Sequence, residues 1–367
     1  MTEHFVDLSV KATTFKDPQL AKGLIASIEK FAPEQATLME VCGTHTVAIA
    51  RNGIRDLMPA GVKLSSGPGC PVCVTSNKDI DTVIALARVP GVIITTFGDM
   101  TRVPGSTSSL LAEQAAGRDV RIVYSPLDAL KIAQENPERE VVFVGVGFET
   151  TTPLVAMAVK RAAALGLKNF SVFGAHKNMP GALEAIIADP QLKIDALILP
   201  GHVSTIIGIE PYKFLAEKYG IPGVITGFEP LDVLQGIAMI LRQLHEGRAE
   251  IEIAYARGVM AEGNPVARAA IDEVFETCTA TWRGLGEIPG SGYRVREEFA
   301  QFDAVKRFAP EVEATQEPHG CRCGDVLRGI MAPNECPLFR KVCTPENPVG
   351  PCMVSSEGSC AAYFRYY

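Results

Sequence analysis

The stretch EVVFVGVGFETTTPLVAMAVKRAAALG, residues 140–166, carries the alternation that decides the fold. Its first part, residues 140–147, is almost continuously apolar, which is typical of a strand buried on both faces. Residues 153–166 follow with apolar side chains at helical spacing. A buried strand followed by a helix is the unit of a parallel sheet that helices cover.

The same alternation continues along most of the chain. Helical segments such as residues 231–247 separate the apolar runs, and nine buried strands suit two sheets better than one. We therefore predict an α/β protein with two parallel-sheet α/β domains facing a central cleft, plus a Cys-rich domain. The other eight strand candidates are residues 36–42, 61–66, 91–99, 120–125, 170–176, 195–201, 223–229 and 250–256.

Composition shifts divide the chain into four parts. A polar stretch at residues 133–140 precedes a new strand, and strand patterns fade after about residue 255. We expect a helical segment at 1–35, α/β domains at 36–135 and 136–255, and a helical, Cys-rich domain at 256–367. Asp17 and Pro18 predict the N-cap and first turn of the N-terminal helix, which we expect to pack with the C-terminal domain.

Composition and charge argue against several classes of protein. The chain is 47% hydrophobic and 21% charged, with a formal net charge of −7, which gives no basic surface for nucleic acid or anionic membrane. No stretch approaches the roughly 18 consecutive apolar residues of a membrane span. The N-terminus shows no basic segment followed by an apolar one, so no secretory signal is predicted. We expect a cytoplasmic protein that binds neither nucleic acid nor membrane.

Ten cysteines are many for a chain in a reducing cytosol, where they more often bind metals or carry out redox chemistry than staple a fold. Cys42, Cys70 and Cys73 lie early, and Cys278 is predicted to be a core residue in a helical stretch. The tail from about residue 310 is rich in Pro and Gly, so we expect a metal centre or cross-links to hold it. It contains Cys321, Cys323, Cys336, Cys343, Cys352 and Cys360.

Six of the predicted strands end in glycine-containing turns with reactive or charged side chains. Ligand sites of open α/β sheets form at the carboxyl ends of strands, so two facing sheets would gather these turns at one cleft. Such turns also favour glycine and polar caps for structural reasons alone. No Walker or G-x-G-x-x-G motif follows the strands, so a nucleotide site is not indicated. The turns carry Cys42 with His45, Asp99, Glu149, His176 with Lys177, His202, and Glu229.

The turn EVCGTH at residues 40–45 is a candidate metal site. Cys42 ends a strand at the start of a predicted helix, and a helix N-terminus favours thiolate over thiol. His45 follows three residues later and could share the same face, as a second ligand or a proton carrier. The alternative is a buried cysteine with a capping histidine.

The stretch GPGCPVC at residues 67–73 holds a C-x-x-C pair, which occurs in zinc sites, redox motifs and iron–sulfur sites. Cys73 meets the start of a predicted helix, which again favours thiolate chemistry. A closed zinc site needs two further ligands at comparable spacing, and the chain has no second C-x-x-C. We therefore predict a dithiol–disulfide couple at Cys70 and Cys73, with a plain turn as the alternative.

The six C-terminal cysteines are the strongest signal of a metal centre. Four thiolates would complete an iron–sulfur cluster and leave two over. A zinc ion held by four cysteines is the alternative. Six cysteines offer fifteen choices of four, and spacing alone does not decide among them.

Together these motifs resemble the family of the hydrogenase maturation protein HypD. The resemblance implies two α/β domains plus an iron–sulfur domain. It also implies a [4Fe–4S] cluster on cysteines spaced C-x14-C-x6-C-x16-C, here Cys321, Cys336, Cys343 and Cys360. The matching motifs are CGTH (42–45), GPGCPVC (67–73), FGDMTRVPG (97–105), GFETTTP (147–153), GHVSTIIG (201–208), GFEPLD (227–232) and CMVSSEGSCAAYF (352–364).

The resemblance further implies a redox relay. Cys323 and Cys352 remain as a pair beside the cluster, an arrangement similar to ferredoxin–thioredoxin reductase. Cys70 and Cys73 would then be the substrate-side pair of a relay that runs from the cluster through Cys323 and Cys352.

By the same resemblance, the function is metallocentre assembly rather than conventional enzyme turnover. HypD proteins build the Fe(CN)2CO unit of [NiFe]-hydrogenases with the small protein HypC, through which it reaches the hydrogenase large subunit, and cyanide comes from HypE. The transient iron with its CN and CO ligands would bind at Cys42, an open position near Asp99, Glu149, His202 and Glu229. Two alternatives are a general iron–sulfur thiol–disulfide reductase and a docking module whose metal only folds the tail.

Overall fold

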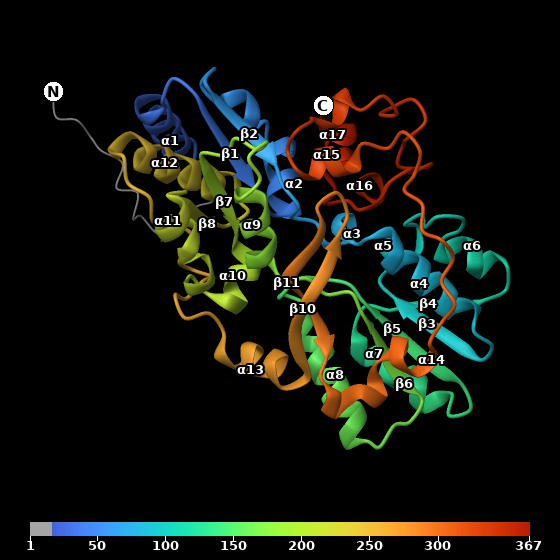
Figure 1. Cartoon of the computed structure of the whole chain (residues 1–367). Helices are drawn as coiled ribbons and strands as arrows, with labels where there is room; N and C mark the ends of the chain where they lie inside the picture. The colour runs from blue at the N-terminus through green and yellow to red at the C-terminus, as the bar shows by residue number, and fades with distance from the viewer. Residues whose placement is uncertain (1–16) are drawn as a thin grey trace.

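The computed structural model describes residues 17–367 and contains two parallel sheets and one antiparallel hairpin (Figure 1). The nine strands expected from the sequence are all present. The first sheet has the order β2-β1-β7-β8-β9, and the second has the order β4-β3-β5-β6. The strands are β1 (Ala36–Glu40), β2 (Val62–Ser66), β3 (Val92–Thr96), β4 (Asp119–Ile122), β5 (Glu140–Gly145), β6 (Phe170–Gly174), β7 (Ala196–Pro200), β8 (Gly223–Thr226) and β9 (Ile251–Ile253).

Helices cover both faces of the five-stranded sheet. Leu38 and Ile198 pack on one face against α1 (Pro18–Phe31), α2 (Gly43–Arg51) and α12 (Pro230–Glu246). Met39 and Leu197, their neighbours in the chain, point to the other face, where α9 (Met179–Ile187), α10 (Gly201–Ile207) and α11 (Lys213–Tyr219) lie. The central strand β7, which reads ALILP, is buried along its whole length, as expected for a strand covered on both faces.

The four-stranded sheet is covered in the same way. On one face lie α7 (Pro126–Glu135), α8 (Thr152–Ala164) and α13 (Pro265–Val274), which bury Phe143 and Val172. On the other face, α4 (Asn77–Arg88) and α6 (Leu110–Ala115) bury Val142 and Val144. The alternation along β5 therefore places successive side chains in two different cores, which confirms the prediction from residues 140–166.

The predicted division near residue 135 does not match the two sheets. β3 and β4 lie before this boundary, yet β3 pairs with β5 beyond it, with Ile93 opposite Val141. The five-stranded sheet takes β1 and β2 from the start of the chain and β7 to β9 from later, with Leu38 opposite Ala196. Periodicity identifies strands locally, whereas their pairing depends on long crossovers that leave no local signal.

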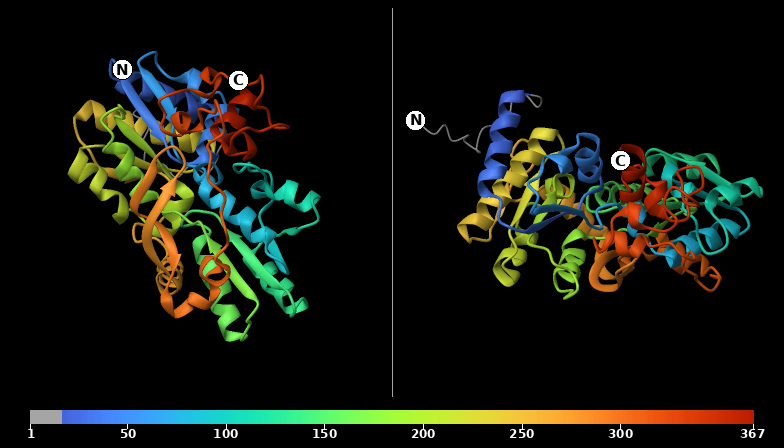
Figure 2. Two further views of the ribbon diagram at one scale, coloured as in Figure 1. Left: turned by 45° about the vertical axis from the view of Figure 1, so that its right-hand side comes forward. Right: turned by 90° about the horizontal axis from the view of Figure 1, so that it is seen from above.

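The N-terminal helix packs on a different neighbour from the one expected. Asp17 caps α1, and its side chain accepts a hydrogen bond from Gln19 N–H, as predicted. Leu24 and Ile28 of α1, however, are buried in the core that α12 shares, beside Leu234 and Ile237. In the right-hand view of Figure 2, α1 lies next to α12 and apart from the C-terminal segment. The sequence predicts the apolar stripe of α1 but does not indicate that α12 is the helix against which it packs.

A β-hairpin replaces the helical stretch expected around Cys278. Its strands are β10 (Phe275–Trp282) and β11 (Gly286–Val295), paired antiparallel. Cys278 lies in β10 and is partly exposed, so the prediction of a helical core residue is wrong. Threonine and aromatic residues in FETCTATW favour an extended chain. Because the side chains of β10 alternate between buried and more exposed positions, this strand needs fewer apolar residues than the buried parallel strands.

The C-terminal segment consists of short elements that pack beside α2 and α3 (Figure 1). Its helices are α15 (Cys323–Leu327), α16 (Pro351–Val354) and α17 (Ser359–Tyr366). Within residues 17–367, no helix is both long and apolar enough to cross a bilayer. The remaining short elements are α3 (Pro71–Val74), α5 (Gly98–Thr101), α14 (Ala304–Phe308) and the 3-10 turns Ile54–Leu57, Glu210–Tyr212, Glu297–Phe302 and Pro333–Glu335.

Candidate metal and thiol site

Cys42 lies where the sequence places it, between the end of β1 and the first turn of α2. It is buried, and its main-chain N–H donates to the buried Glu40 carboxylate (N···Oε2 3.2 Å). Burial, reinforced by the Glu357 carboxylate, raises the pKa of the Cys42 thiol to about 12. The backbone N–H groups at the helix start act in the opposite direction but are outweighed. The helix start alone therefore does not make Cys42 a thiolate; a cation bound to the sulfur would do so.

His45 connects α2 to the end of β8. Its Nε2 lies 3.0 Å from the Gly227 carbonyl oxygen and 2.8 Å from Thr226 Oγ1. The carbonyl acceptor requires that Nε2 carry the proton, which leaves Nδ1 with a lone pair. Among the described residues this buried Nδ1 has no hydrogen-bond partner. Burial lowers the pKa of His45 to about 4, so the ring is neutral at pH 7.

Neighbouring strands of the five-stranded sheet bring three of the predicted turns together. Cys42 and His45 follow β1, His202 lies in the first turn of α10 after β7, and Glu229 caps α12 after β8. Phe228 stacks with both histidines, its ring centroid 4.8 Å from that of His45 and 3.8 Å from that of His202. The backbone N–H of Glu229 donates to the Asp232 carboxylate, so Glu229 has a structural role in the helix start.

The two predicted site residues in the turns of the four-stranded sheet, Glu149 and Asp99, differ in burial. Glu149 is buried; its Oε1 accepts a hydrogen bond from Met179 N–H (3.0 Å). Burial raises the pKa of Glu149 to about 7. Burial also raises the pKa of the Tyr212 hydroxyl well above its usual range, and negative charge on Glu149 or Cys42 would raise it further. Tyr212 therefore lies within electrostatic reach of both groups. Asp99 is exposed, and within residues 17–367 no hydrogen bond or ion pair connects its carboxylate to another predicted site residue.

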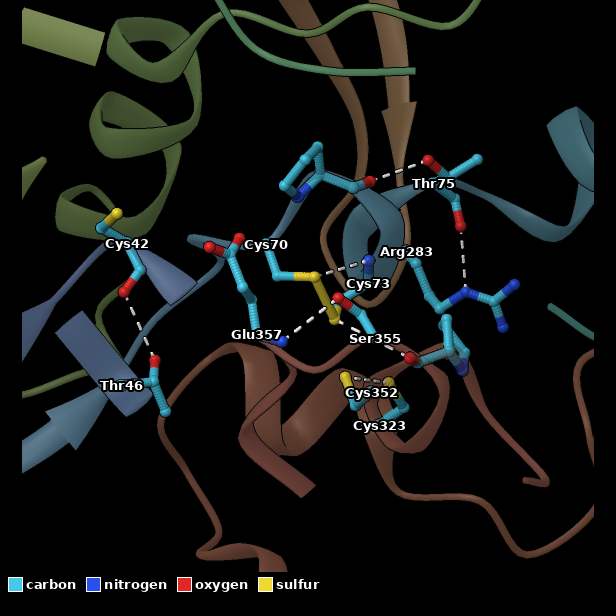
Figure 3. The surroundings of a disulfide bond; sticks show 12 residues. Cys42, Thr46, Cys70, Cys73, Thr75, Arg283, Cys323, Cys352, Ser355 and Glu357 are labelled. Carbon is cyan, nitrogen blue, oxygen red and sulfur yellow. Dashed lines mark hydrogen bonds between the residues drawn. A yellow bond between two sulfur atoms is a disulfide. The ribbon is translucent and has the colours of Figure 1, made fainter. Parts of the chain in front are cut away.

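Cys70 and Cys73 form a disulfide at the start of α3 (Figure 3). Both are buried, at 3% and 0% exposed, and Cys70 Sγ accepts a hydrogen bond from Cys73 N–H (3.2 Å). The pairing agrees with the predicted couple, while its reduction stays a prediction. Cys73 Sγ also lies 3.9 Å from the Pro351 carbonyl oxygen, so the disulfide touches the C-terminal segment directly.

Glycines allow the Cys42 turn to contact both other cysteine segments. A Cβ on Gly69 would lie 2.2 Å from Cys42 N, and Gly43 N–H donates to the Gly69 carbonyl (3.0 Å). A Cβ on Gly43 would lie 2.6 Å from Glu357 Cβ. Next to it, Thr44 Oγ1 donates to Glu357 Oε1 (2.7 Å). The glycines of CGTH and GPGCPVC are thus required by close approach of two backbones.

All six C-terminal cysteines line one pocket that is partly open to solvent. Leu338, Phe339 and Val326 form apolar walls. In the described part of the chain no three His, Cys, Asp or Glu side chains converge as they would around a single metal ion. A [4Fe–4S] cluster takes its cysteines on different irons, so its ligands stand farther apart than those of one ion. By donor chemistry the pocket fits such a cluster, and the choice of four ligands stays a prediction.

Cys323 and Cys352 contact each other in the wall of this pocket, with 2.7 Å between their sulfur atoms. Hydrogen bonds from Cys321 and Cys352, with the Arg283 cation nearby, hold the pKa of the Cys323 thiol well below its usual range. Cys323 and Cys352 belong to the same buried cluster as Cys70 and Cys73. Figure 3 shows the two pairs close together, the disulfide on α3 and the thiols on the C-terminal segment.

Three residues of this region escaped the sequence analysis. Glu40 lies under Cys42 and accepts from Thr46 Oγ1 (2.6 Å); a charged residue inside an apolar strand was the available signal. Glu357 belongs to the SSEG part of a matched motif, but nothing in it pointed toward Cys42. Arg283 is 4% exposed at the hairpin tip, and the helical interpretation of that stretch concealed it.

Comparison with known proteins extends over nearly the whole chain. Residues 19–367 match the family model HypD, described as "Hydrogenase formation hypA family". The chain is 50% identical over 367 residues to "Hydrogenase maturation factor HypD" of Rhodobacter capsulatus, covering 97% of each protein. It is 51% identical to the Azotobacter vinelandii protein of that name (96% of this chain, 95% of the relative) and 46% identical to that of Cupriavidus necator (96% of each). The chain therefore belongs to the HypD family of hydrogenase maturation factors.

Proposed function

We propose that this protein, with HypC, is the cytoplasmic scaffold on which the Fe(CN)2CO unit of [NiFe]-hydrogenases is assembled. HypE would supply cyanide, and HypC would carry the product to the hydrogenase large subunit. The observation that supports this most is the contact between three cysteine groups: the Cys42 turn, the Cys70–Cys73 disulfide, and the pocket with six cysteines. A protein that only docked partners would not need to join them.

The Cys42 turn suits an iron that is cargo rather than a resident cofactor. It offers one soft sulfur, which fits a cyano-iron centre, and His45, three residues further on, keeps a buried Nδ1 without a hydrogen-bond partner among the described residues. Three or four protein ligands would close the site, whereas one sulfur leaves positions for CN, CO and a cysteine of HypC. The neutral His45 and the glycines at Gly43 and Gly69 keep the turn compact without adding charge.

The C-terminal pocket suits the resident cofactor. Cys321, Cys336, Cys343 and Cys360 would hold a [4Fe–4S] cluster, which when bound supplies single electrons. The protein's own contribution is exchange between its two other cysteine pairs. The Cys323 and Cys352 thiols are oxidised to one disulfide while the Cys70–Cys73 disulfide is reduced to two thiols. One S–S bond forms and one breaks, and two electrons and two protons pass between the pairs.

Burial of the Cys70–Cys73 disulfide favours this proposal over a general thiol–disulfide reductase. Such a reductase must expose a sulfur to the disulfide of another protein, because exchange proceeds by direct attack of sulfur on sulfur. Here both sulfurs are covered, and their contacts are with the chain's own C-terminal segment. A buried pair can serve a small molecule or a neighbouring pair, but a folded partner cannot reach it.

Vibrational spectroscopy of the protein purified together with HypC tests the proposal. We expect cyanide and carbonyl stretches from a bound iron unit, present when HypE is coexpressed and lacking cyanide bands when it is omitted. Absence of diatomic bands from a complex that contains stoichiometric HypC and iron would contradict the proposal.

A further inference from the structure

The β10–β11 hairpin reaches from the core of the four-stranded sheet to both cysteine pairs. At its base, Phe275 and Val295 are buried in the core of the four-stranded sheet. Near its tip, Trp282 and Ile288 are buried in the cluster that contains Cys70, Cys73, Cys323 and Cys352. The Trp282 indole N–H donates to Ser291 Oγ across the hairpin (2.8 Å), which fixes the ring within the hairpin. The tip is therefore anchored on one side and inserted between the cysteine segments on the other.

Arg283, the first residue of the turn, holds the loop that follows the disulfide. Its backbone N–H donates to the Val74 carbonyl (2.9 Å), and its Nε donates to the Thr75 carbonyl (3.0 Å). One terminal nitrogen hydrogen-bonds the Asn77 side chain, and the other lies 3.2 Å from Glu317 Oε2. The Arg283 side chain is 3% exposed, whereas that of Glu317 is 65% exposed. One side chain thus connects α3, the start of α4 and the C-terminal segment.

Gly284, the next residue, meets the helix that carries Cys323. A Cβ on Gly284 would lie 2.4 Å from the Gly324 Cα, and a Cβ on Gly324 would lie 2.9 Å from the Gly284 Cα. Gly284 also has φ of +79°, a conformation that residues with a side chain rarely adopt. Two glycines in backbone contact leave the hairpin tip no room for adjustment against α15.

We propose that Arg283 is a positioning residue for exchange between the two cysteine pairs. Its guanidinium fixes the Cys70–Cys73 loop, and the adjacent Gly284 fixes the Cys323 helix, so the hairpin tip sets the separation of the pairs. Lysine can replace it only in part, because an ammonium lacks the planar fork that meets three partners at once. The inference rests on the relay in the proposed function.

The test measures transfer between the pairs in the cluster-loaded protein, with both pairs oxidised at the start. The protein is mixed with dithionite, quenched in acid, labelled with thiol reagent and analysed by mass spectrometry, which gives the reduced fraction of each pair over time. In Arg283→Gln we expect Cys323 and Cys352 to be reduced as in the wild type. Reduction of Cys70 and Cys73 should be slower by roughly tenfold to a hundredfold, since a misplacement of about 1 Å costs that much. Arg283→Lys should recover only part of the rate.

Two further variants separate position from charge and from misfolding. Arg294→Gln removes an exposed arginine of the same hairpin, paired with Glu276, and should leave both rates unchanged. Gly284→Ala keeps the arginine but displaces the tip from Gly324, and should slow the same step. If Arg283→Gln and Gly284→Ala transfer electrons as fast as the wild type, the inference is wrong. If Cys323→Ser reduces Cys70 and Cys73 as fast as the wild type does, the relay in the proposed function is wrong instead.

Discussion

Burial decides the protonation of the polar side chains at the strand ends. His45 and His176 are held neutral, with pKa values lowered to about 4 and about 3. Glu149 moves the other way, to about 7, because burial disfavours its charged form. A sequence shows which side chains can titrate, but the size of each pKa shift depends on how far the folded chain excludes water from that side chain. The residue types of the site were therefore predictable, while their charge states were not.

His176 should make stability depend on pH. The residue is 2% exposed, and within the described chain neither ring nitrogen has a hydrogen-bond partner. The unfolded histidine takes up a proton below pH 6.5, while the folded one resists until about pH 3. The stability from neutral His176 is therefore present above pH 6.5 and lost as pH falls. Between pH 7 and pH 5, His176→Leu should lose about 2 kcal/mol less unfolding free energy than the wild type.

Denaturant unfolding at both pH values measures this difference. His319→Gln changes an exposed histidine and should behave as the wild type does. Equal losses for the wild type and His176→Leu would show that His176 is not held neutral in the folded protein.

The cysteines of the C-terminal pocket should differ in what their loss removes. Replacing Cys321, Cys336, Cys343 or Cys360 by Ala should abolish the visible absorption of the cluster and destabilise the tail, because metal binding and folding are coupled there. Cys323→Ala or Cys352→Ala should leave the iron content nearly intact. Iron analysis and absorption spectra check this. Loss of the cluster in Cys323→Ala together with its retention in Cys321→Ala would reverse the assignment.

At the scale of elements, the buried strands were predictable and the hairpin was not. β5, with side chains in two cores, is apolar throughout and reads as a strand from sequence alone. β10 has alternating exposure and follows α13 without a break at Val274, so the sequence of this strand resembles a continuation of the helix. The turns that carry Cys42 and Cys70 were located correctly, yet the contact between them depends on Gly69, whose role appears only once the backbones meet.

Gly69 should be intolerant of any side chain. Gly69→Ala would place a Cβ 2.2 Å from a main-chain nitrogen that belongs to Cys42 and cannot rotate away. We expect a loss of about 1–3 kcal/mol in unfolding free energy, as for overpacked sites, together with loss of iron from Cys42 and retention of the cluster absorption. Gly98→Ala is the matched control, because its Cβ would find its nearest neighbour at 3.8 Å. Unchanged stability and iron binding in Gly69→Ala would contradict the packing described here.

At the scale of the whole molecule, the chain leaves the first sheet after β2 and returns to it at β7. This path explains why a linear division into domains failed and how distant motifs meet. β1 and β7 are neighbours, so the turns after them lie together. The C-terminal segment then packs against α2 and α3, which carry the motifs CGTH and GPGCPVC. The resemblance to the HypD family implies that these motifs act together, whereas composition and periodicity do not indicate that they lie close to one another.

The most direct test of the central claim, that Cys42 holds the iron being assembled, is the vibrational spectrum of Cys42→Ala in complex with HypC. We expect the cyanide and carbonyl bands to disappear while the cluster absorption and the fold persist, because no cluster ligand is removed. Cys278→Ala, a cysteine in β10 away from the three cysteine groups, should retain all bands. Full cyanide and carbonyl bands in Cys42→Ala would show that the iron is held elsewhere.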